Sequence, residues 1–332
     1  PIEESARKQF CEEAFEKERR GLVEIIDYQS LTNLPDEQFP KALKVSPLSA
    51  TPHKSRGWRA ILDLSWLLKW LGGELDSVNA TSTKRAPRGA IDQIGHALYR
   101  IIYAMASALD GKKVYLAKWD VKDGFWQMVA ARGAEWNFCY VLPQETGAPI
   151  RIVKPTSLQM GWIESPPFFG VASETARDVA QVYAQAPLGA LPPHKFEHYA
   201  QSHRDFKELP EVSPEVDQMQ FSLEVYVDDF IGLVAASSQQ ELTHVARAVM
   251  HGMHDVFPAT RNEEDDPNSV KKLKKGDGAF ALEKDALGFD FDGGERTLIL
   301  GEAKRDALLA TLREWKRLAR RRGRKRKPAG QR

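Results

Sequence analysis

The sequence predicts an α+β fold with a partly antiparallel sheet. Three observations in the second half of the chain predict it. An apolar strand segment lies at 113–119, a long helix begins near Ser165, and two strand segments follow within 221–235. The short separation of the last two segments indicates a hairpin, so this part of the sheet is antiparallel.

The composition is that of a globular protein. The chain has 332 residues, of which 42% are apolar and 28% charged, enough for two or more compact units. Cys11 and Cys139 lie far apart without metal-ligand spacing, which suits a reducing compartment and excludes a disulfide scaffold. No apolar stretch approaches the roughly 20 residues of a membrane span, and no signal-peptide pattern is present. We therefore expect no membrane association and a cytoplasmic or nuclear location.

The charge is distributed unevenly along the chain. Residues 315–332 hold ten Lys or Arg and no acid, which leaves 37 basic against 46 acidic residues elsewhere, a net charge of −9. The basic tail is thus a separate electrostatic feature. It could bind nucleic-acid phosphates or act as a nuclear import signal, or it could be a disordered end.

Taken in order, the first half of the chain predicts a charged helix, an extended region and a helix before the first core strand. The tight basic connection at 53–57 leads into a strand, and Asp110-Gly111 ends the second helix as a turn signal. The expected elements are a helix at 4–20, an extended region from 42 to about 68 with a strand at 58–64, a helix at 90–109 and a strand at 113–119.

The second half predicts a long helix, two hairpins and two further helices. Ser165 is expected to cap the long helix, with proline at its first position. Residues 186–220 lack periodicity and indicate an inserted loop or small subdomain, and 262–278 are polar. The expected elements are a strand at 136–142, helices at 165–185, 239–256 and 302–318, and hairpins at 221–235 and 285–300, with 285–291 as one strand of the second hairpin.

Two acids interrupt the apolar hairpin. Asp228 and Asp229 stand in the run 221–235, which contains no Lys or Arg to neutralise them. An Asp-Asp pair is a poor hairpin turn, because such turns favour Asn-Gly, Asp-Gly or Gly-Gly. Two crowded carboxylates repel each other unless a proton or a divalent cation intervenes. The pair predicts a hard-metal site, and a solvated acidic turn is the alternative.

A third acid ends the strand at 113–119. If this strand and the hairpin are neighbours in one sheet, Asp120, Asp228 and Asp229 meet at one edge. Three carboxylates suit two Mg²⁺ ions about 3.5–4 Å apart, with Mn²⁺ as a substitute, and this arrangement assists in-line phosphoryl displacement. The sequence therefore predicts a nucleotidyltransferase.

These segments resemble the reverse transcriptases of LTR retrotransposons and retroviruses. Asp120-Val-Lys-Asp-Gly-Phe-Trp-Gln127 is similar to the first palm motif of that family, and Tyr226-Val-Asp-Asp229 matches the third. Three further segments appear in the family's order: 58–63 resembles a fingers strand, 157–169 the second motif and 287–289 the primer grip. The resemblance covers about 54–300.

The resemblance implies a role for each matching residue. Asp120, Asp228 and Asp229 would bind the metal ions, with Asp120 bridging both. Arg59 would grip the incoming triphosphate through its planar guanidinium, with Lys54 as a companion cation. The remaining implied substrate contacts are Phe125 against the sugar, Tyr226 near the primer terminus, Gln159 at the template or nucleotide, and Gly161, which permits close backbone approach.

The lysine cluster and several of these residues also have ordinary interpretations. Arg59 could be a solvated strand residue, Phe125 a core aromatic, and Tyr226 a strand residue. One of Lys271, Lys272, Lys274 and Lys275 could protonate the leaving pyrophosphate, but the cluster equally fits a solvated loop. No single lysine can be assigned from sequence.

The chain departs from the family pattern in three places. Met160 occupies the position that usually carries Gln, the connection at 186–220 is long, and about thirty residues follow the primer-grip-like hairpin at 285–300. A complete thumb does not fit in that length. We therefore expect a truncated or excised polymerase domain, and the start at Pro1 fits a fragment.

The implied architecture is a right-hand polymerase with fingers and palm and with the thumb truncated or absent. Its expected parts are a helical lead-in at 1–40, fingers at 41–112, a palm at 113–300, and a thumb start with basic tail at 301–332. Within the palm, the fingers return at about 130–156, an insertion lies at about 186–220, and the primer-grip-like hairpin lies at 285–300.

The expected function is RNA-directed DNA synthesis by a retroelement enzyme. The partners are an RNA or DNA template with its primer and dNTPs, and the sequence leaves the oligomeric state open. A catalytically weak or inactive nucleic-acid-binding remnant is the main alternative. A palm polymerase that copies DNA is a third.

Overall fold

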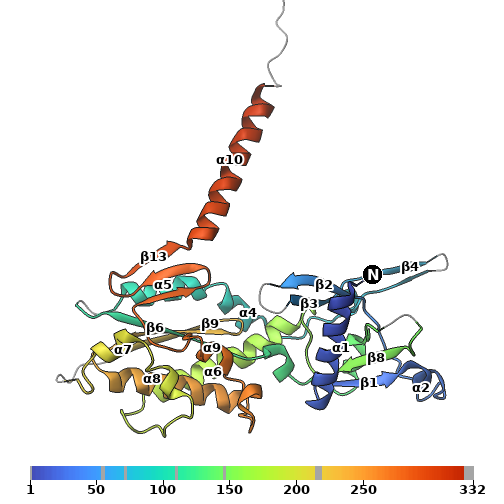
Figure 1. Cartoon of the computed structure of the whole chain (residues 1–332), viewed down its shortest axis with the longest axis horizontal. Helices are drawn as coiled ribbons and strands as arrows, with labels where there is room; N and C mark the ends of the chain where they lie inside the picture. The colour runs from blue at the N-terminus through green and yellow to red at the C-terminus, as the bar shows by residue number, and fades with distance from the viewer. Residues whose placement is uncertain are drawn as a thin grey trace, which may run out of the picture.

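The computed structural model describes residues 2–53, 57–70, 73–108, 111–144, 147–213 and 219–324. Helices and sheets are mixed, as the sequence predicts, in two lobes side by side (Figure 1). The N-terminal lobe comprises residues 4–81 and 134–155, and the main lobe holds most of the rest. None of the described helices combines the length and apolar character of a membrane span.

The N-terminal lobe contains small antiparallel sheets and one long helix. β1, β8 and β7 pair in that order, β2 pairs with β3, and β4 pairs with β5. The elements up to the main lobe are α1 (Glu4–Arg19), β1 (Val23–Asp27), α2 (Tyr28–Thr32), β2 (Leu48–His53), β3 (Gly57–Leu62), β4 (Leu68–Trp70), β5 (Gly73–Leu75) and α3 (Val78–Thr81), with η2 (Ala134–Phe138), β7 (Tyr140–Val141) and β8 (Arg151–Pro155) returning later.

The main lobe is built on a three-stranded sheet with the strand order β6, β10, β9. Its elements are α4 (Arg88–Ile94), α5 (Ala97–Ala106), β6 (Val114–Asp120), η1 (Gly124–Gln127), α6 (Ser165–Ala184), η3 (Glu197–Tyr199), α7 (Arg204–Glu208), β9 (Gln220–Tyr226), β10 (Asp229–Ala235), α8 (Gln239–Val256), η4 (Glu263–Asp265), α9 (Val270–Leu273), β11 (Glu283–Ala286), β12 (Phe289–Asp292), β13 (Thr297–Leu300) and α10 (Glu302–Arg324).

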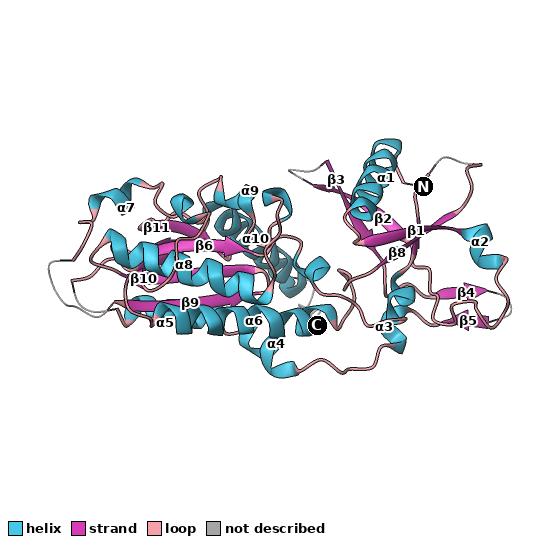
Figure 2. Cartoon of the chain, turned by 90° about the horizontal axis from the view of Figure 1, so that it is seen from below, coloured by secondary structure: helices cyan, strands magenta, loops and turns pink. Residues whose placement is uncertain are grey.

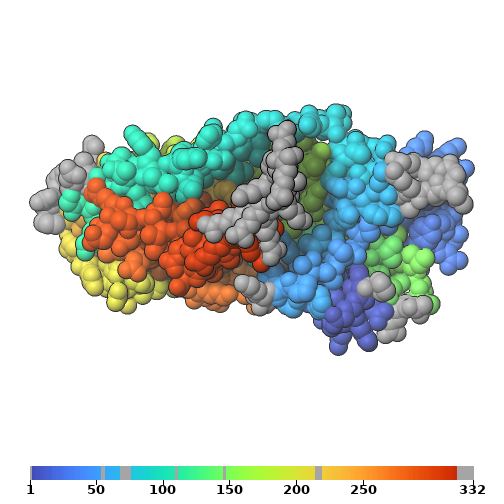
Figure 3. Space-filling view, turned by 90° about the horizontal axis from the view of Figure 1, so that it is seen from above, coloured from blue at the N-terminus to red at the C-terminus, as the bar shows by residue number. Residues whose placement is uncertain are grey.

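Both faces of this sheet are covered, because its strands alternate two sets of apolar side chains. Trp119 and Phe230 belong to the core shared with α6 and α8, and Leu116 and Ile231 belong to the core shared with α5 and the β11–β13 sheet. Figure 2 shows α6 and α8 along the strands, and Figure 3 shows the C-terminal elements beside α5 on the opposite side. The strands are therefore rigidly held, and so are the residues at their ends.

The segment expected as an insertion, 186–220, is part of the main core within its described residues, 186–213 and 219–220. Phe196, Ala200 and Phe206 are buried in the cluster that holds Trp119. The amide of Phe280 donates to the carbonyl of Ala200 at 3.1 Å. The segment does lack regular periodicity, but it is packed against α8 rather than looped away from the fold.

Three expected elements were wrong in detail. The helix at 90–109 is two helices, because the chain departs from a single helix at Gly95-His96, and glycine weakens a helix interior. The strand at 136–142 is divided: 136–138 belong to the 3₁₀ helix η2, which places Phe138 against Trp162 with ring centroids 5.2 Å apart, and only Tyr140–Val141 form a strand, β7. The run 285–291 is two strands, because Leu287 and Gly288 have φ of 52° and 81°, values typical of a tight hairpin turn.

The last helix is longer than expected. α10 extends to Arg324 and projects from the main lobe (Figure 1), whereas the sequence predicted its end near 318. Its exposed apolar residues are Leu308, Leu309, Leu312, Trp315 and Leu318. Residues 325–332, which carry part of the basic tail, lie outside the described residues.

Candidate active site

The three predicted acids meet at one end of the central sheet. β10 pairs antiparallel with β6, and the register places Asp229 directly opposite Asp120. Residues directly opposite in such a pair have neighbouring side chains. The condition on which the sequence prediction depended, that the two strands are adjacent, is met.

The hairpin that carries the acid pair has a two-residue turn, Val227-Asp228, between paired Tyr226 and Asp229. Val227 has φ of 59°, a conformation that is costly for a β-branched residue. The carbonyl of Asp228 accepts a 3.0 Å hydrogen bond from the amide of Val121. The turn is thereby tied to the chain that follows Asp120, which fixes all three acids in one place.

A lysine lies between two of these acids. The Lys272 ammonium donates to Oδ1 of Asp120 at 2.5 Å and to Oδ1 of Asp229 at 3.3 Å. Asp120 is 8% exposed. Its burial raises the pKa of the Asp120 carboxyl to about 7, with Asp228 and Asp229 adding to the rise and Lys272 opposing it. Burial also raises the pKa of Asp228, with the charge of Asp229 as the next cause. Burial and mutual repulsion thus oppose full ionisation of the three carboxyls.

The chemistry of the donor set fits a hard divalent cation. Carboxylates are the ligands that Mg²⁺ prefers, and three of them come here from the end of β6 and from the β9–β10 hairpin. The Lys272 ammonium already places a positive charge among them. As the side chains stand, the described residues contain no group of three or more acidic, His or Cys side chains arranged around one point as metal ligands. Binding a metal ion would therefore require the Asp side chains to turn and Lys272 to withdraw.

Of the predicted triphosphate contacts, one can be placed. Arg59 lies on β3 in the N-terminal lobe, is exposed, and its guanidinium reaches Sδ of Met160 at 2.8 Å. The fingers-like strand and the second motif are thus in contact. Lys54 lies outside the described residues.

Gln159 and Gly161 are in the loop before α6. The Gln159 side chain is 5% exposed and donates to the carbonyls of Ser157 and Leu158 at 3.0 Å, so it faces its own loop. Ser165, expected as the helix cap, is instead the first helical residue, and its hydroxyl donates to the Gln159 carbonyl at 2.8 Å. A contact of Gln159 with template or nucleotide stays a prediction.

Gly161 has a steric reason to be glycine. Its φ is +100°, and a Cβ there would lie 3.0 Å from the carbonyl oxygen of Leu62 on β3. Its own carbonyl accepts from the side chain of Asn79 at 2.9 Å. The close backbone approach predicted from the sequence is present, and it joins the second motif to β3.

We expect Gly161→Ala to destabilise the protein by about 1–3 kcal/mol, because it adds both backbone strain and a contact with Leu62. Gly133→Ala is the matched control: Gly133 also has positive φ, but a Cβ added there would meet no atom within 4 Å. Urea unfolding of both variants measures the difference. Equal losses would show that the Leu62 contact has no energetic weight.

Phe125 and Tyr226 lie beside the acids in the chain. Phe125, on η1, is partly buried and packs edge-on against Phe169, with ring centroids 5.4 Å apart. Tyr226 ends β9 and is 45% exposed. The edge of Phe125 that contacts Phe169 thus belongs to the core, whereas Tyr226 is accessible to solvent. Their substrate contacts stay predictions.

Sequence reasoning missed two charged residues of this region. Lys272 was one of four equivalent lysines, and only its position on α9, packed beside β6, distinguishes it. Glu164 is the second: its side chain is fully buried and accepts hydrogen bonds from the amides of Arg85 and Ala86 and from Arg88. A glutamate before a Ser-Pro-Pro helix start was the available signal.

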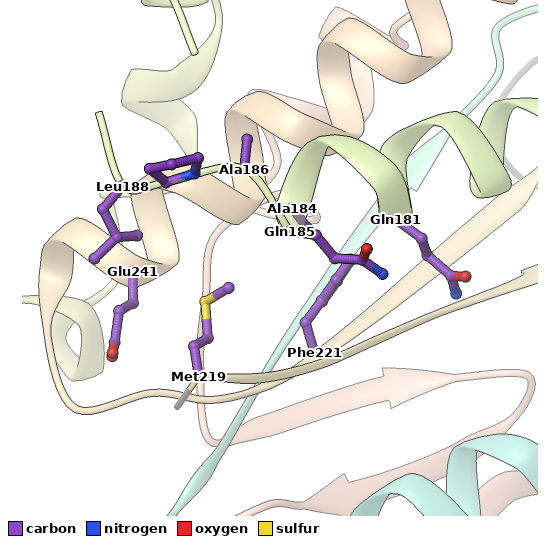
Figure 4. Close-up of a pocket in the computed structure, with 9 residues that line it drawn as sticks. Gln181, Ala184, Gln185, Ala186, Leu188, Met219, Phe221 and Glu241 are labelled. Carbon is purple, nitrogen blue, oxygen red and sulfur yellow. The ribbon is translucent and has the colours of Figure 1, made fainter. Parts of the chain in front are cut away.

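A hollow of about 580 Å³ lies at the other end of β9, away from the acids (Figure 4). Gln181, Gln185, Met219 and Phe221 line it. Glu241, at its border, accepts from the amides of Ser237 and Ser238 at the start of α8. Among the described residues that line it, only Glu241 is charged, so the acids are the better candidate site.

Comparisons with known proteins give partial overlaps. No protein-family model and no curated protein sequence matches the chain. A solved structure of the foamy viral protease-reverse transcriptase in complex with dsDNA superposes with a TM-score of 0.49 and 14% identity, covering 93% of this chain and 44% of that one. The native prototype foamy virus protease-reverse transcriptase gives 0.46 and 16%, covering 90% and 27%. The chain spans less than half the length of each of these structures. Its function is therefore inferred from the residues of its own site.

Proposed function

We propose that this chain is the polymerase domain of a retroelement reverse transcriptase, with a fingers and palm architecture and nucleotidyltransferase activity. One observation carries the proposal: Asp120 and the Tyr226-Val-Asp-Asp229 hairpin lie opposite each other on adjacent antiparallel strands. Each of these acids alone could be a solvated surface residue, but the strand pairing brings acids from two separate motifs to one point.

Asp120, Asp228 and Asp229 are the residues that would hold two Mg²⁺ ions, or Mn²⁺. When bound, such ions neutralise charge on the attacking and leaving oxygens of a phosphoryl transfer. The chain's own part is positioning: the paired strands hold the carboxylates, and the tie between Asp228 and Val121 fixes the turn. Arg59 would bind the triphosphate of a dNTP from the opposite lobe.

The finer assignment rests on the resemblance of the motifs. Phe125 would exclude a 2′-hydroxyl and so favour deoxynucleotides, and an RNA or DNA template with its primer would lie across the sheet end. A cytoplasmic or nuclear location accompanies this function. The reaction joins the primer 3′-oxygen to the α-phosphorus of the dNTP, breaks its bond to the β-phosphate oxygen, and releases pyrophosphate and the hydroxyl proton.

A second candidate is an inactive nucleic-acid-binding remnant of such a polymerase. The contact of Lys272 with two of the three acids favours it, because this cation occupies the space among the carboxylates. If Lys272 cannot withdraw, the acids are satisfied without metal.

Mg²⁺-dependent dNTP incorporation on poly(rA) primed with oligo(dT) tests the proposal. We expect incorporation by the unmodified chain and none by the Asp228→Asn, Asp229→Asn variant, which retains both side-chain volumes. Primer-template binding without incorporation by the unmodified chain would favour the remnant. Equal incorporation by both proteins would exclude the acids from the chemistry.

A further inference from the structure

The segment 266–272 packs against the acid cluster through backbone and side-chain hydrogen bonds. The amide of Lys122 donates to the carbonyl of Pro267 at 2.8 Å, and the amide of Ser269 donates to the carbonyl of Asp120 at 3.0 Å. The same segment carries Lys272, which contacts the Asp120 carboxylate. The backbone from the Asp120 carbonyl to the Lys122 amide is thus paired with 267–269, so whatever fixes this segment also fixes Asp120.

Asp266 anchors the start of that segment. Asp266 is fully buried. Its two carboxylate oxygens have different partners. Oδ1 lies 2.7 Å from Nε2 of His254 and accepts from the amide of Asn268 at 3.0 Å, and Oδ2 accepts from Lys195 at 2.6 Å. A buried carboxylate with one partner removed is costly, so Asp266 holds its position only while His254 and Lys195 hold theirs.

A series of hydrogen bonds runs from the amide of Phe196 through His194 and His254 to Asp266. The amide of Phe196 donates to Nδ1 of His194 at 3.2 Å, so the proton of neutral His194 is on Nε2. That nitrogen lies 3.1 Å from Nδ1 of His254, which must accept. The proton of His254 is then on Nε2, which lies 2.7 Å from Oδ1 of Asp266 and 2.8 Å from Nδ2 of Asn268. Because Nδ2 also donates, this tautomer requires the Asn268 amide to turn its oxygen, which has no hydrogen-bond partner among the described residues, toward Nε2.

The helix α8 holds the residues of this hydrogen-bond series in place. Arg247, His251 and His254 follow the i, i+4, i+7 spacing of one helix face. Arg247 makes a two-point ion pair with Glu197 at 2.5 and 2.9 Å, and Nε2 of His251 lies 3.0 Å from the carbonyl of Pro192. Residues 191–197 are thereby held against α8, with Lys195, Glu197, Arg247, His251 and Asp266 as the charged or titratable groups around the two histidines.

We propose that His254 and Asp266 are positioning residues of the polymerase site: the chain His194–His254–Asp266 sets the segment 266–272, and this segment sets Asp120 and Lys272. The inference rests on the proposed function and deepens it. It gives the 186–213 segment a role, because Lys195 and His194 come from it.

Two substitutions of His254 separate the contacts. His254→Asn keeps a polar group near the position of Nδ1 but cannot reach Asp266, whereas His254→Gln places an amide near the position of Nε2 and retains a donor to Asp266. Glu197→Gln is the matched control, because it weakens the clamp of the same segment on α8 without touching 266–272. Lys195→Met, which removes only the Oδ2 partner of Asp266, serves if His254→Asn does not fold.

The first readout is hydrogen exchange of the amides of Lys122 and Ser269 in the full chain without nucleotide or metal. We expect exchange to be about tenfold faster in His254→Asn and in Lys195→Met, and close to the unmodified protein in His254→Gln and Glu197→Gln. Unchanged exchange in His254→Asn and Lys195→Met would overturn the proposal. So would equal acceleration by Glu197→Gln, because the effect would then be general loosening.

The second readout is dNTP incorporation with a separate determination of kcat and KM. Residues that support metal ligands typically change metal affinity or activity by about 10–100-fold. We expect His254→Asn to lower kcat about tenfold at unchanged KM for primer-template, with recovery in His254→Gln. If the unmodified chain incorporates no dNTP, the proposed function fails, and the exchange measurement alone decides whether His254 positions Asp120.

Discussion

Asp120→Asn is expected to lower Mg²⁺-dependent nucleotide incorporation by at least about a hundredfold without lowering the melting temperature of the metal-free protein. The activity loss follows from removing the negative charge that faces Asp229 across the strand pair. The stability result follows from the raised pKa of the Asp120 carboxyl, about 7, which burial causes. A buried group that resists ionisation destabilises the fold at neutral pH, and Asn removes that cost.

Asp123→Asn is a matched control for this prediction. Asp123 follows the same strand but faces Arg20 at 3.6 Å rather than the acid cluster, so incorporation should stay within about threefold, as expected for a substitution away from the reacting groups. Calorimetry of both variants, alongside the incorporation assay, completes the comparison. Near-normal incorporation by Asp120→Asn would remove Asp120 from the site. A melting temperature several degrees lower would show that the Lys272 ion pair outweighs the burial of the charge.

The position of the acids could be predicted because it depends on local patterns. An apolar strand run that ends in an acid, and an apolar hairpin interrupted by two acids, specify where each carboxylate emerges. Adjacency of the two strands was the one unproven step, and the register of Asp229 with Asp120 confirms it. The roles of these residues in metal binding and catalysis stay predictions.

The supporting residues could not be predicted because they depend on contacts between distant segments. Lys272 differs from its neighbouring lysines only after the chain folds 152 positions back onto Asp120. The 186–213 segment has no periodic pattern, since it is held by individual side chains such as the Glu197–Arg247 pair rather than by a regular apolar face. Gly288 was the available signal for the turn that divides 285–291, and the apolar residues around it obscured that signal.

Glu164→Ala is expected to destabilise the protein by roughly 3 kcal/mol, because it leaves buried donors without a partner. Oε2 of Glu164 accepts from the amides of Arg85 and Ala86 at 2.8 and 2.9 Å, and Oε1 accepts from Arg88. These donors belong to the connection between the N-terminal lobe and α4. Glu164→Gln should lose about 1 kcal/mol, because its amide oxygen can still accept from both backbone amides while Arg88, which is 42% exposed, turns to solvent.

Acid unfolding distinguishes the charge of Glu164 from its hydrogen bonds. Burial opposes ionisation of Glu164, but the amides of Ala86 and Arg85 and the charge of Arg88 prevail and lower the pKa of its carboxyl below the ordinary 4.5. The folded state therefore binds this proton less readily than the unfolded chain, so the stabilisation is complete above that value and is lost as the pH falls below it. Urea unfolding at a series of pH values should show a shallower acid-side decline for Glu164→Gln than for the unmodified protein. Parallel declines would show that the carboxylate charge adds nothing beyond its accepting oxygens, and that the connection is held by geometry alone.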